Sequence, residues 1–193
     1  MADSSNPTKV VTGTVRLSFV NLVEPRVGFV GQAPKYSVLL LIPKEDTKTV
    51  EAIKRAQQAA LDNGKASTFG GSIPKKWKDT FRDGDEEQDT EQAPEYAGHY
   101  FMNVGASEKY PPVLVDQRRQ KLSKDDASVA FYSGMYARVS MNAFPFNAQG
   151  SKGVSFGINA VQKVRDGEPL SGAVVDVDSD FDDLGDDDVD DLI

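Results

Sequence analysis

Residues 135–146 contain the side chains whose order most clearly predicts a chemistry. Alternate positions form two sets: Met135, Ala137, Val139, Met141 and Ala143 on one parity, and Tyr136, Arg138, Ser140, Asn142, Phe144 and Phe146 on the other. Residues of one parity share a face of a β-strand, so one side is apolar and the other combines rings, a guanidinium and hydrogen-bonding groups. Rings stack on unpaired bases and cations neutralise phosphates, whatever the base sequence. We therefore take Tyr136, Arg138, Phe144 and Phe146 as candidate contacts to a single-stranded nucleic acid.

Two groups of cations near this segment extend the hypothesis. The first comprises Arg118, Arg119, Lys121 and Lys124, which precede it, and Lys152, which follows it. The second is Lys75, Lys76, Trp77 and Lys78, where an aromatic ring again lies among cations. A structural alternative stays open for each ring, because aromatic residues on strands also pack against neighbouring strands. For Phe131 and Tyr132 we expect packing, and Trp77 has the alternative of covering an edge of the core.

Acidic residues offer a rival chemistry, that of a magnesium-dependent nuclease. Its ligands would be Asp83, Asp85, Glu86 and Glu87. Consecutive acids in an irregular segment rarely hold the fixed geometry that catalysis needs, so a solvated loop is the favoured interpretation. Asp176, Asp178 and Asp180 alternate as in a calcium loop, but Phe181 and Asp187 replace its glycine and its bidentate glutamate.

Other catalytic and cofactor sites lack their residues in this sequence. The chain has one histidine, His99, and no cysteine, which excludes two-histidine and thiolate zinc sites and cysteine nucleophiles. It has no Gly-x-x-x-x-Gly-Lys loop for a nucleotide phosphate. We expect a protein with no metal, no cofactor and no enzymatic activity, in which His99 is an ordinary strand residue.

The last twenty residues change the meaning of the net charge. The chain carries −8, but residues 174–193, which we call the acidic tail, hold ten aspartates and no cation, so residues 1–173 carry about +2. Repulsion among the carboxylates predicts a solvated, disordered tail. A mildly basic body attached to its own polyanion suggests a body that holds another polyanion.

The elements that must position these residues follow from periodicity. Val11, Gly13, Val15, Leu17 and Phe19 alternate with polar residues and predict a strand with one buried face. Residues 36–42 are apolar on both faces, which is typical of a central strand. Residues 47–62 have helical spacing, with Asp46 or Thr47 as N-cap and Gly64 at the expected C-terminus. Residues 65–95 lack a period and predict a long loop.

Further strands complete a β-rich domain. We expect strands at 100–104, 113–116 and 132–146, and a turn at 147–153 leading into a strand at 154–164. The predicted fold is mainly β, a curved five-stranded barrel with an inserted helix and long loops; the alternative is an open antiparallel sheet under one helix. The predicted organisation is one domain over residues 1–173, followed by the acidic tail.

Two sequence blocks carry a family resemblance. The segments Phe131-Tyr132-Ser133-Gly134-Met135-Tyr136 and Gly153-Val154-Ser155-Phe156-Gly157, with the run that follows to Glu168 and the aspartate-rich end, resemble a family of bacteriophage single-stranded DNA-binding proteins over most of residues 8–193. The resemblance implies an OB fold and single-strand binding in phage DNA replication, recombination and repair. It also implies a tail that occupies the DNA groove when DNA is absent and contacts replication proteins through Asp186, Asp187, Asp188, Asp190, Asp191, Leu192 and Ile193.

The chain end departs from the broader pattern, and composition bounds the rest. Many single-strand binding proteins end in an aromatic residue, whereas this chain ends in Leu192 and Ile193. No apolar run approaches the ~20 residues of a membrane span, and the absence of cysteine and of a signal peptide favours the cytoplasm. We expect a cytoplasmic, non-membrane binder of single-stranded DNA, with a homo-oligomer compatible with the sequence. The alternative is an interaction protein whose tail mimics DNA and recruits basic enzymes.

Overall fold

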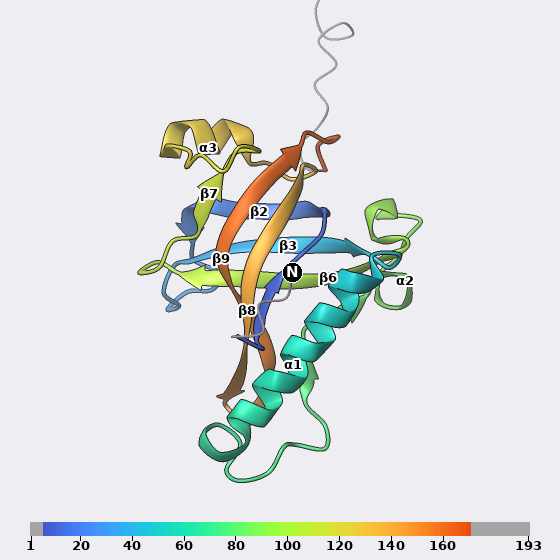
Figure 1. Ribbon diagram of the computed structural model, residues 1–193, viewed down its shortest axis with the longest axis vertical. Helices are drawn as coiled ribbons and strands as arrows, with labels where there is room; N and C mark the ends of the chain where they lie inside the picture. Colours follow the sequence, from blue (N-terminus) through green and yellow to red (C-terminus); the bar gives the residue numbers. More distant parts are fainter. Residues whose placement is uncertain (1–5, 171–193) are drawn as a thin grey trace, which may run out of the picture.

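Five long strands pair into a closed ring, in the order β8, β2, β3, β6 and β9, with β9 pairing back to β8 (Figure 1). The computed structural model describes residues 6–170. The strands are β1 (Lys9–Val11), β2 (Val15–Arg26), β3 (Lys35–Pro43), β4 (Lys78–Asp79), β5 (Arg82–Asp83), β6 (His99–Ser107), β7 (Val113–Val115), β8 (Tyr136–Ala148) and β9 (Ser151–Arg165). Within the ring only β6 and β9 are parallel. The predicted mainly β, five-stranded OB-like barrel is confirmed.

Four short or inserted helical segments join the strands. They are α1 (Thr47–Ser67), α2 (Gly84–Glu87), the 3₁₀ turn η1 (Pro94–Tyr96) and α3 (Lys124–Ala130). Figure 1 shows α1 running beside the lower half of the β8–β9 hairpin, where it contacts β8, β1 and β9. Residues 65–95, which the sequence predicted as one loop, contain the end of α1 together with β4, β5, α2 and η1.

The helix α1 begins as predicted and ends later. The Asp46 side chain accepts a hydrogen bond from the Thr49 amide and caps the first turn. The prediction that Gly64 ends the helix is wrong, because the helix continues to Ser67. Gly64 is buried instead: a Cβ atom there would lie 2.6 Å from the Cβ of Pro145, so the glycine permits a close approach of α1 to β8.

The buried face of the first predicted strand is correct at Val15 and Leu17 and wrong at Val11 and Phe19. The chain forms β1 and β2 with a break at residues 12–14, and Val11 is exposed while Val15 and Leu17 are buried. Phe19 has a φ of 47° at a register shift in β2 and points outward, so it is exposed and not part of the buried face. A bulge of this kind moves the following residues to the opposite face, and Leu22 is therefore the next buried side chain.

The predicted central strand is confirmed, and the structure explains its two apolar faces. Val38, Leu40 and Ile42 point into the barrel core, where Met102, Met141 and Phe156 are also buried. The alternate residues Leu39 and Leu41 form a second cluster with Tyr96 and Phe101 on the outer side of the barrel. The rings of Tyr96 and Phe101 meet edge to face at 5.1 Å. The η1 segment therefore covers part of the outer face of β3 and β6.

None of the described helices has the length and apolar character needed to cross a membrane. Residues 171–193 lie outside the described residues, and with them lie the predicted domain boundary at residue 173, the predicted disorder of the acidic tail and all of its candidate contact residues.

Candidate nucleic-acid interface

The strand β8 has the two faces that its sequence predicted. Ala137, Val139, Met141 and Ala143 are buried, and the alternate residues point outward, with Arg138 exposed and Phe144 45% exposed. We use the name hairpin face for the outward residues of the β8–β9 hairpin: Arg138, Ser140, Asn142, Phe144, Ser155, Gly157 and Asn159. It presents one ring, one guanidinium and small polar groups.

Small residues continue this face around the barrel. Asn142 pairs with Gly157, Gly157 with Gly105 on β6, and Gly105 with Ser37 on β3. Neighbouring strands lie about 4.8 Å apart, so these four positions span about 14 Å across the sheet. Because two of the four are glycines, the backbone is open to close approach by a flat group. Phe144 stands at the border of this open strip, with its Cε1 atom 3.9 Å from where a Cβ atom of Gly157 would lie.

Tyr136 lies between two guanidinium groups. The Arg165 guanidinium lies 3.6 Å from the ring centroid and that of Arg16 lies 5.6 Å from it. Arg16 also donates to the carbonyl oxygens of Gly134 and Glu168, at 3.1 and 2.7 Å. Tyr136 is half-buried, and its ring holds two cations in place rather than offering an open stacking surface.

The other predicted rings pack more than they protrude. Phe146 is half-buried beside Gly153, and Trp77 is half-buried against the barrel core, which agrees with the structural alternative for Trp77. Phe131 is buried and Tyr132 is half-buried, and both pack against the core as expected. Of the four rings proposed as contacts, Phe144 is the most open to solvent.

The predicted lysines near Trp77 lie at one end of the hairpin. The strand β4 pairs with β9, with Lys78 opposite Gly153, and Lys75, Lys76 and Lys78 are exposed. Lys152 Nζ donates to the Phe69 carbonyl oxygen at 3.3 Å. Their side chains therefore place positive charge around the end of the hairpin that lies beside α1.

The predicted cations of residues 118–121 lie toward the opposite end. Arg118, Arg119 and Lys121 are exposed in the turn after β7, which pairs with β9 at Val113 and Ala160. Asp116 Oδ1 accepts hydrogen bonds from the Arg118 and Gln120 amides, both at 2.8 Å, and fixes this turn. Lys124 differs from these cations because it pairs with Glu24. The structure thus separates the predicted cations into two groups, one at each end of the hairpin.

An exposed apolar loop was missed by the sequence reasoning, which treated it as a turn. The loop joins β2 to β3, and Val27, Phe29 and Val30 are exposed, Phe29 by 75%. Tyr110, after β6, is 69% exposed, with Lys109 Nζ 5.7 Å from its ring centroid. OB folds bind oligonucleotides on the face of their second and third strands and with the loop between their first and second strands. The β2–β3 loop occupies the place of that loop here. The available signal was an apolar Phe-Val pair between Gly28 and Gly31.

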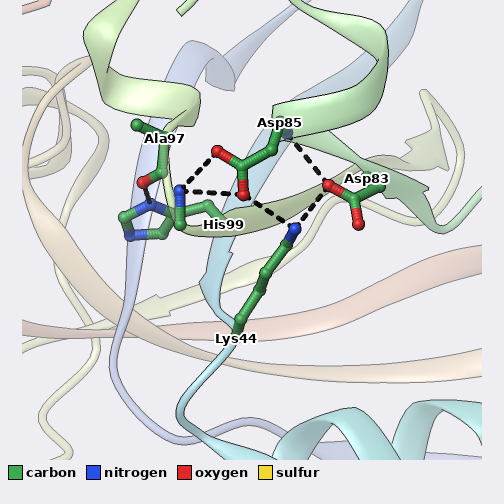
Figure 2. A network of polar contacts seen from close by, with 6 residues as sticks. Lys44, Asp83, Asp85, Ala97 and His99 are labelled. Carbon is green, nitrogen blue, oxygen red and sulfur yellow. Dashed lines mark hydrogen bonds and ion pairs between the residues drawn. The ribbon is translucent and has the colours of Figure 1, made fainter.

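Two of the four candidate nuclease carboxylates, Asp83 and Asp85, are engaged by a lysine. Lys44 Nζ lies between Asp83 and Asp85 (Figure 2), 2.6 Å from Asp83 Oδ1 and 2.7 Å from Asp85 Oδ2. The Gly98 amide donates to Asp85 Oδ1 at 3.0 Å. The hydrogen bond from Lys44 lowers the pKa of Asp83 and that of Asp85, and the hydrogen bonds to Asp83 and Asp85 raise the pKa of Lys44. Arg82 pairs with Glu87 at 2.6 Å. Among residues 6–170 no group of three or more His, Asp or Glu side chains is arranged to hold a metal ion.

His99 completes this region as a structural residue. Its Nδ1 lies 2.7 Å from the Ala97 carbonyl oxygen at the start of β6. Together with the Lys44 contacts, this network fixes residues 83–99 against the end of β3, and so holds η1 over the outer face of the barrel.

The end of the described chain lies beside the same outer face. Leu170 packs against the cluster of Leu39, Leu41, Tyr96 and Phe101, and its amide donates to the Ser133 carbonyl oxygen at 3.0 Å. In the sequence, the acidic tail begins four positions after Leu170, whose side chain lies on the outer side of β3.

The ring of strands, its parallel β6–β9 pair and its outward polar face define an OB-type barrel. The chain belongs to the family described as Enterobacter phage Enc34, ssDNA-binding protein, whose model matches residues 8–193. The resemblance seen in the sequence is thereby confirmed, and so is the expectation of a binding protein rather than an enzyme.

Individual relatives agree with this family. Protein p50 of Acyrthosiphon pisum secondary endosymbiont phage 1 is 31% identical over 183 residues, which are 91% of this chain and 94% of that protein. The single-stranded DNA-binding protein of bacteriophage Enc34, solved in complex with ssDNA, superposes with a TM-score of 0.74 at 23% identity, over 85% of this chain and 90% of that one. The T7 protein gp2.5, a single-stranded DNA-binding protein, gives a TM-score of 0.61 at 15% identity, over 92% and 96%. Both structures share the fold.

Proposed function

We propose that this chain binds single-stranded DNA without marked sequence preference, through the hairpin face and the strip of small residues beside it. The observation that carries the proposal is Phe144, an exposed ring beside Gly157, which pairs with Gly105, with Arg138 on the same face. A base stacks on a ring through its π-face, which all four bases possess, so such a contact tolerates any sequence. Family membership supports the same function.

The cations at the two ends of the hairpin contribute phosphate contacts. In this proposal Arg118, Arg119 and Lys121 act at one end, and Lys75, Lys76, Lys78 and Lys152 act at the other. Tyr136 holds Arg16 and Arg165 at the open end of the hairpin, where Tyr136 pairs with Arg165. Trp77 and Phe146 support the hairpin from their packed positions. Contacts of this kind weaken as salt increases, because binding releases cations from the DNA.

The acidic tail competes for the same face in this proposal. Leu170 lies on the outer side of β3, and only residues 171–173 separate it in the sequence from the acidic tail and its ten aspartates. An attached polyanion has a high effective concentration at a nearby cationic surface. DNA displaces it, and the tail is then available to basic partners.

The wider role follows from the family and the tail together. We propose that the chain is a domain of residues 1–173 with the tail of residues 174–193, and that it acts in phage DNA replication, recombination and repair in the host cytoplasm. Replication proteins would contact Asp186, Asp187, Asp188, Asp190, Asp191, Leu192 and Ile193. Pull-down from an infected-cell extract with the full chain and with the chain lacking residues 174–193 tests this role: partners that remain without the tail argue against it.

Substitutions of Phe144 test the stacking contact directly. Phe144→Tyr keeps a ring, and Phe144→Leu keeps apolar surface without one. Loss of one stacked base costs about 1–3 kcal/mol, so Phe144→Leu should weaken oligothymidylate binding by about 5- to 150-fold. Phe144→Tyr should bind like the unmodified chain. Fluorescence anisotropy with labelled oligothymidylate measures both, and equal affinities for the two variants would contradict stacking at this position.

A further inference from the structure

A polar groove lies between β1 and the first half of α1, beyond the hairpin face. Its volume is about 630 Å³. Four cations line it: Lys9 from β1, Lys48 and Arg55 from α1, and Arg138 from β8. The groove thus gathers positive charge from three elements that lie far apart in the sequence, and we call it the β1–α1 groove.

The positive charge of this groove is not neutralised by ion pairs. Within residues 6–170, none of these four side chains forms an ion pair with a carboxylate. Two carboxylates, Asp46 and Glu51, also line the groove. Asp46 is committed to the helix, because it accepts hydrogen bonds from the Thr49 amide at 3.2 Å and from the Thr49 hydroxyl at 2.6 Å. Cations therefore outnumber anions in the groove by two to one.

A hydrogen bond to the backbone of Thr12 fixes the orientation of the Arg138 side chain. Its Nε donates to the Thr12 carbonyl oxygen at 3.1 Å, while the Thr12 hydroxyl accepts from the Val139 amide at 3.0 Å. A guanidinium held through Nε presents its two terminal nitrogens as a preset pair of donors, the geometry that suits a phosphate.

The groove is continuous with the hairpin face. Lys9 pairs with Asn142, which is the first position of the strip of small residues, and Arg138 points outward on the same strand as Phe144. Arg138 and Phe144 are six positions apart along β8, a distance of about 20 Å. A strand of nucleic acid that stacks on Phe144 can therefore pass Asn142 and Lys9 and enter the groove.

The residues of the groove select the part of the nucleic acid that it can bind. Apart from the charged residues, Val10, Val11, Thr12, Gly13, Thr49 and Ala52 line it, so it contains no aromatic ring on which a base could stack. Cations without rings contact phosphates and offer a base no stacking surface.

We propose that the β1–α1 groove binds the sugar-phosphate backbone of single-stranded DNA where the strand leaves the hairpin face. This inference rests on the proposed function. It adds a second part to the binding site, which lengthens the site and attracts the DNA only through charge. Oligonucleotides too short to reach the groove gain nothing from it.

The test compares two double variants of the full-length chain at low salt. Lys48→Ala with Arg55→Ala removes two cations from the groove, and Lys54→Ala with Lys65→Ala removes two exposed cations of α1 that do not line it. Each is titrated with oligothymidylate of about 4 and about 30 nucleotides, which lie at the lower end and beyond the upper end of the ~4–16-nucleotide site sizes of OB folds. The groove variant should bind the long oligonucleotide about tenfold more weakly, with a log-log salt slope smaller by about 1.4. Its affinity for the short one should match that of the control.

Several outcomes would overturn the inference. If the groove and control variants lose equal affinity, or if the groove variant loses equal affinity for both oligonucleotide lengths, the groove is not a separate binding site for the DNA backbone. A groove variant that binds DNA more tightly means that the groove holds the chain's own acidic end instead. If the unmodified chain binds neither oligonucleotide, the proposed function itself fails, which differs from a chain that binds both lengths and is indifferent to Lys48 and Arg55.

Discussion

Phe144 on β8 and Gly157 on β9 point outward side by side, and the glycine leaves the edge of the ring uncovered. A Cβ atom on Gly157 would lie 3.9 Å from Cε1 of Phe144 and 3.8 Å from the Gly105 carbonyl oxygen, both ordinary contact distances. A small side chain therefore fits at residue 157 without moving its neighbours, whereas a large one must lie over the strip of small residues.

This relationship predicts a graded effect of side-chain size at Gly157. Gly157→Ala should bind oligothymidylate within about threefold of the unmodified chain, and Gly157→Leu should bind at least about tenfold more weakly, since its side chain covers the place of a stacked base. Circular dichroism and thermal unfolding verify that both variants fold. Undiminished binding by a folded Gly157→Leu variant would show that the DNA does not cross this strip.

The Lys44 network predicts a stability that depends on pH. The pKa values of Asp83 and Asp85 lie below their ordinary value of 3.8 in the folded chain, mainly because both accept hydrogen bonds from Lys44. This contribution is present at pH values above about 4 and is lost as the pH falls through the lowered pKa values. Lys44→Met should therefore lower the melting temperature at pH 7, and the difference from the unmodified chain should shrink near pH 3.

A matched control for Lys44 is Lys54→Met, which removes an exposed lysine of α1 that forms no ion pair within the described residues. It should leave the melting temperature nearly unchanged at both pH values. A Lys44→Met difference that is the same at pH 7 and pH 3 would argue against the ion pairs as its cause.

The local patterns of the sequence predicted what depends on near neighbours. The alternation along β8 correctly predicted that Ala137, Val139, Met141 and Ala143 are buried, because the side-chain period of a strand is a property of the strand alone. The N-cap at Asp46 was predictable because it depends only on a residue three positions away, Thr49. The stacking role of Phe144 remains a prediction.

Pairings between distant segments were not predictable from those patterns. Nothing in the order of residues places Gly105 beside Gly157, or Lys9 beside Lys48 and Arg55, because the parallel β6–β9 pair and the packing of α1 on β1 depend on the closed ring. The outward turn of Phe19 depends on a single positive φ that interrupts the alternation. Both the strip of small residues and the β1–α1 groove therefore emerged only from the structure.

The close approach of Gly64 to Pro145 predicts a stability effect at a helical position where alanine normally helps. A Cβ atom on Gly64 would lie 2.6 Å from the Cβ of Pro145 and 2.9 Å from Cε2 of Phe69. Alanine has the higher helix propensity by about 1 kcal/mol, but overpacking of a core contact costs about 1–3 kcal/mol. Gly64→Ala should therefore not stabilise the chain, and we expect a net loss of about 1 kcal/mol in urea unfolding.

The control for Gly64 is its exposed neighbour in the same helix, Asn63→Ala, which gains helix propensity without a new contact. It should be neutral or slightly stabilising. If Gly64→Ala stabilised the chain as much as Asn63→Ala, α1 and β8 would not approach as closely as the structure shows.

Removal of residues 174–193 tests whether the acidic tail competes with DNA. Leu170 lies on the outer side of β3 and precedes the acidic tail by four positions in the sequence, and removal of the tail also changes the net charge of the chain from −8 to about +2. The shortened chain should bind oligothymidylate more tightly than the full chain at low salt, and its affinity should fall with salt at a log-log slope of about −0.7 for each phosphate neutralised. A second chain that keeps the tail length but has asparagine for all ten aspartates separates charge from bulk. If it binds as the full chain does while the shortened chain binds more tightly, the tail acts by covering the surface, and competition between polyanions is refuted.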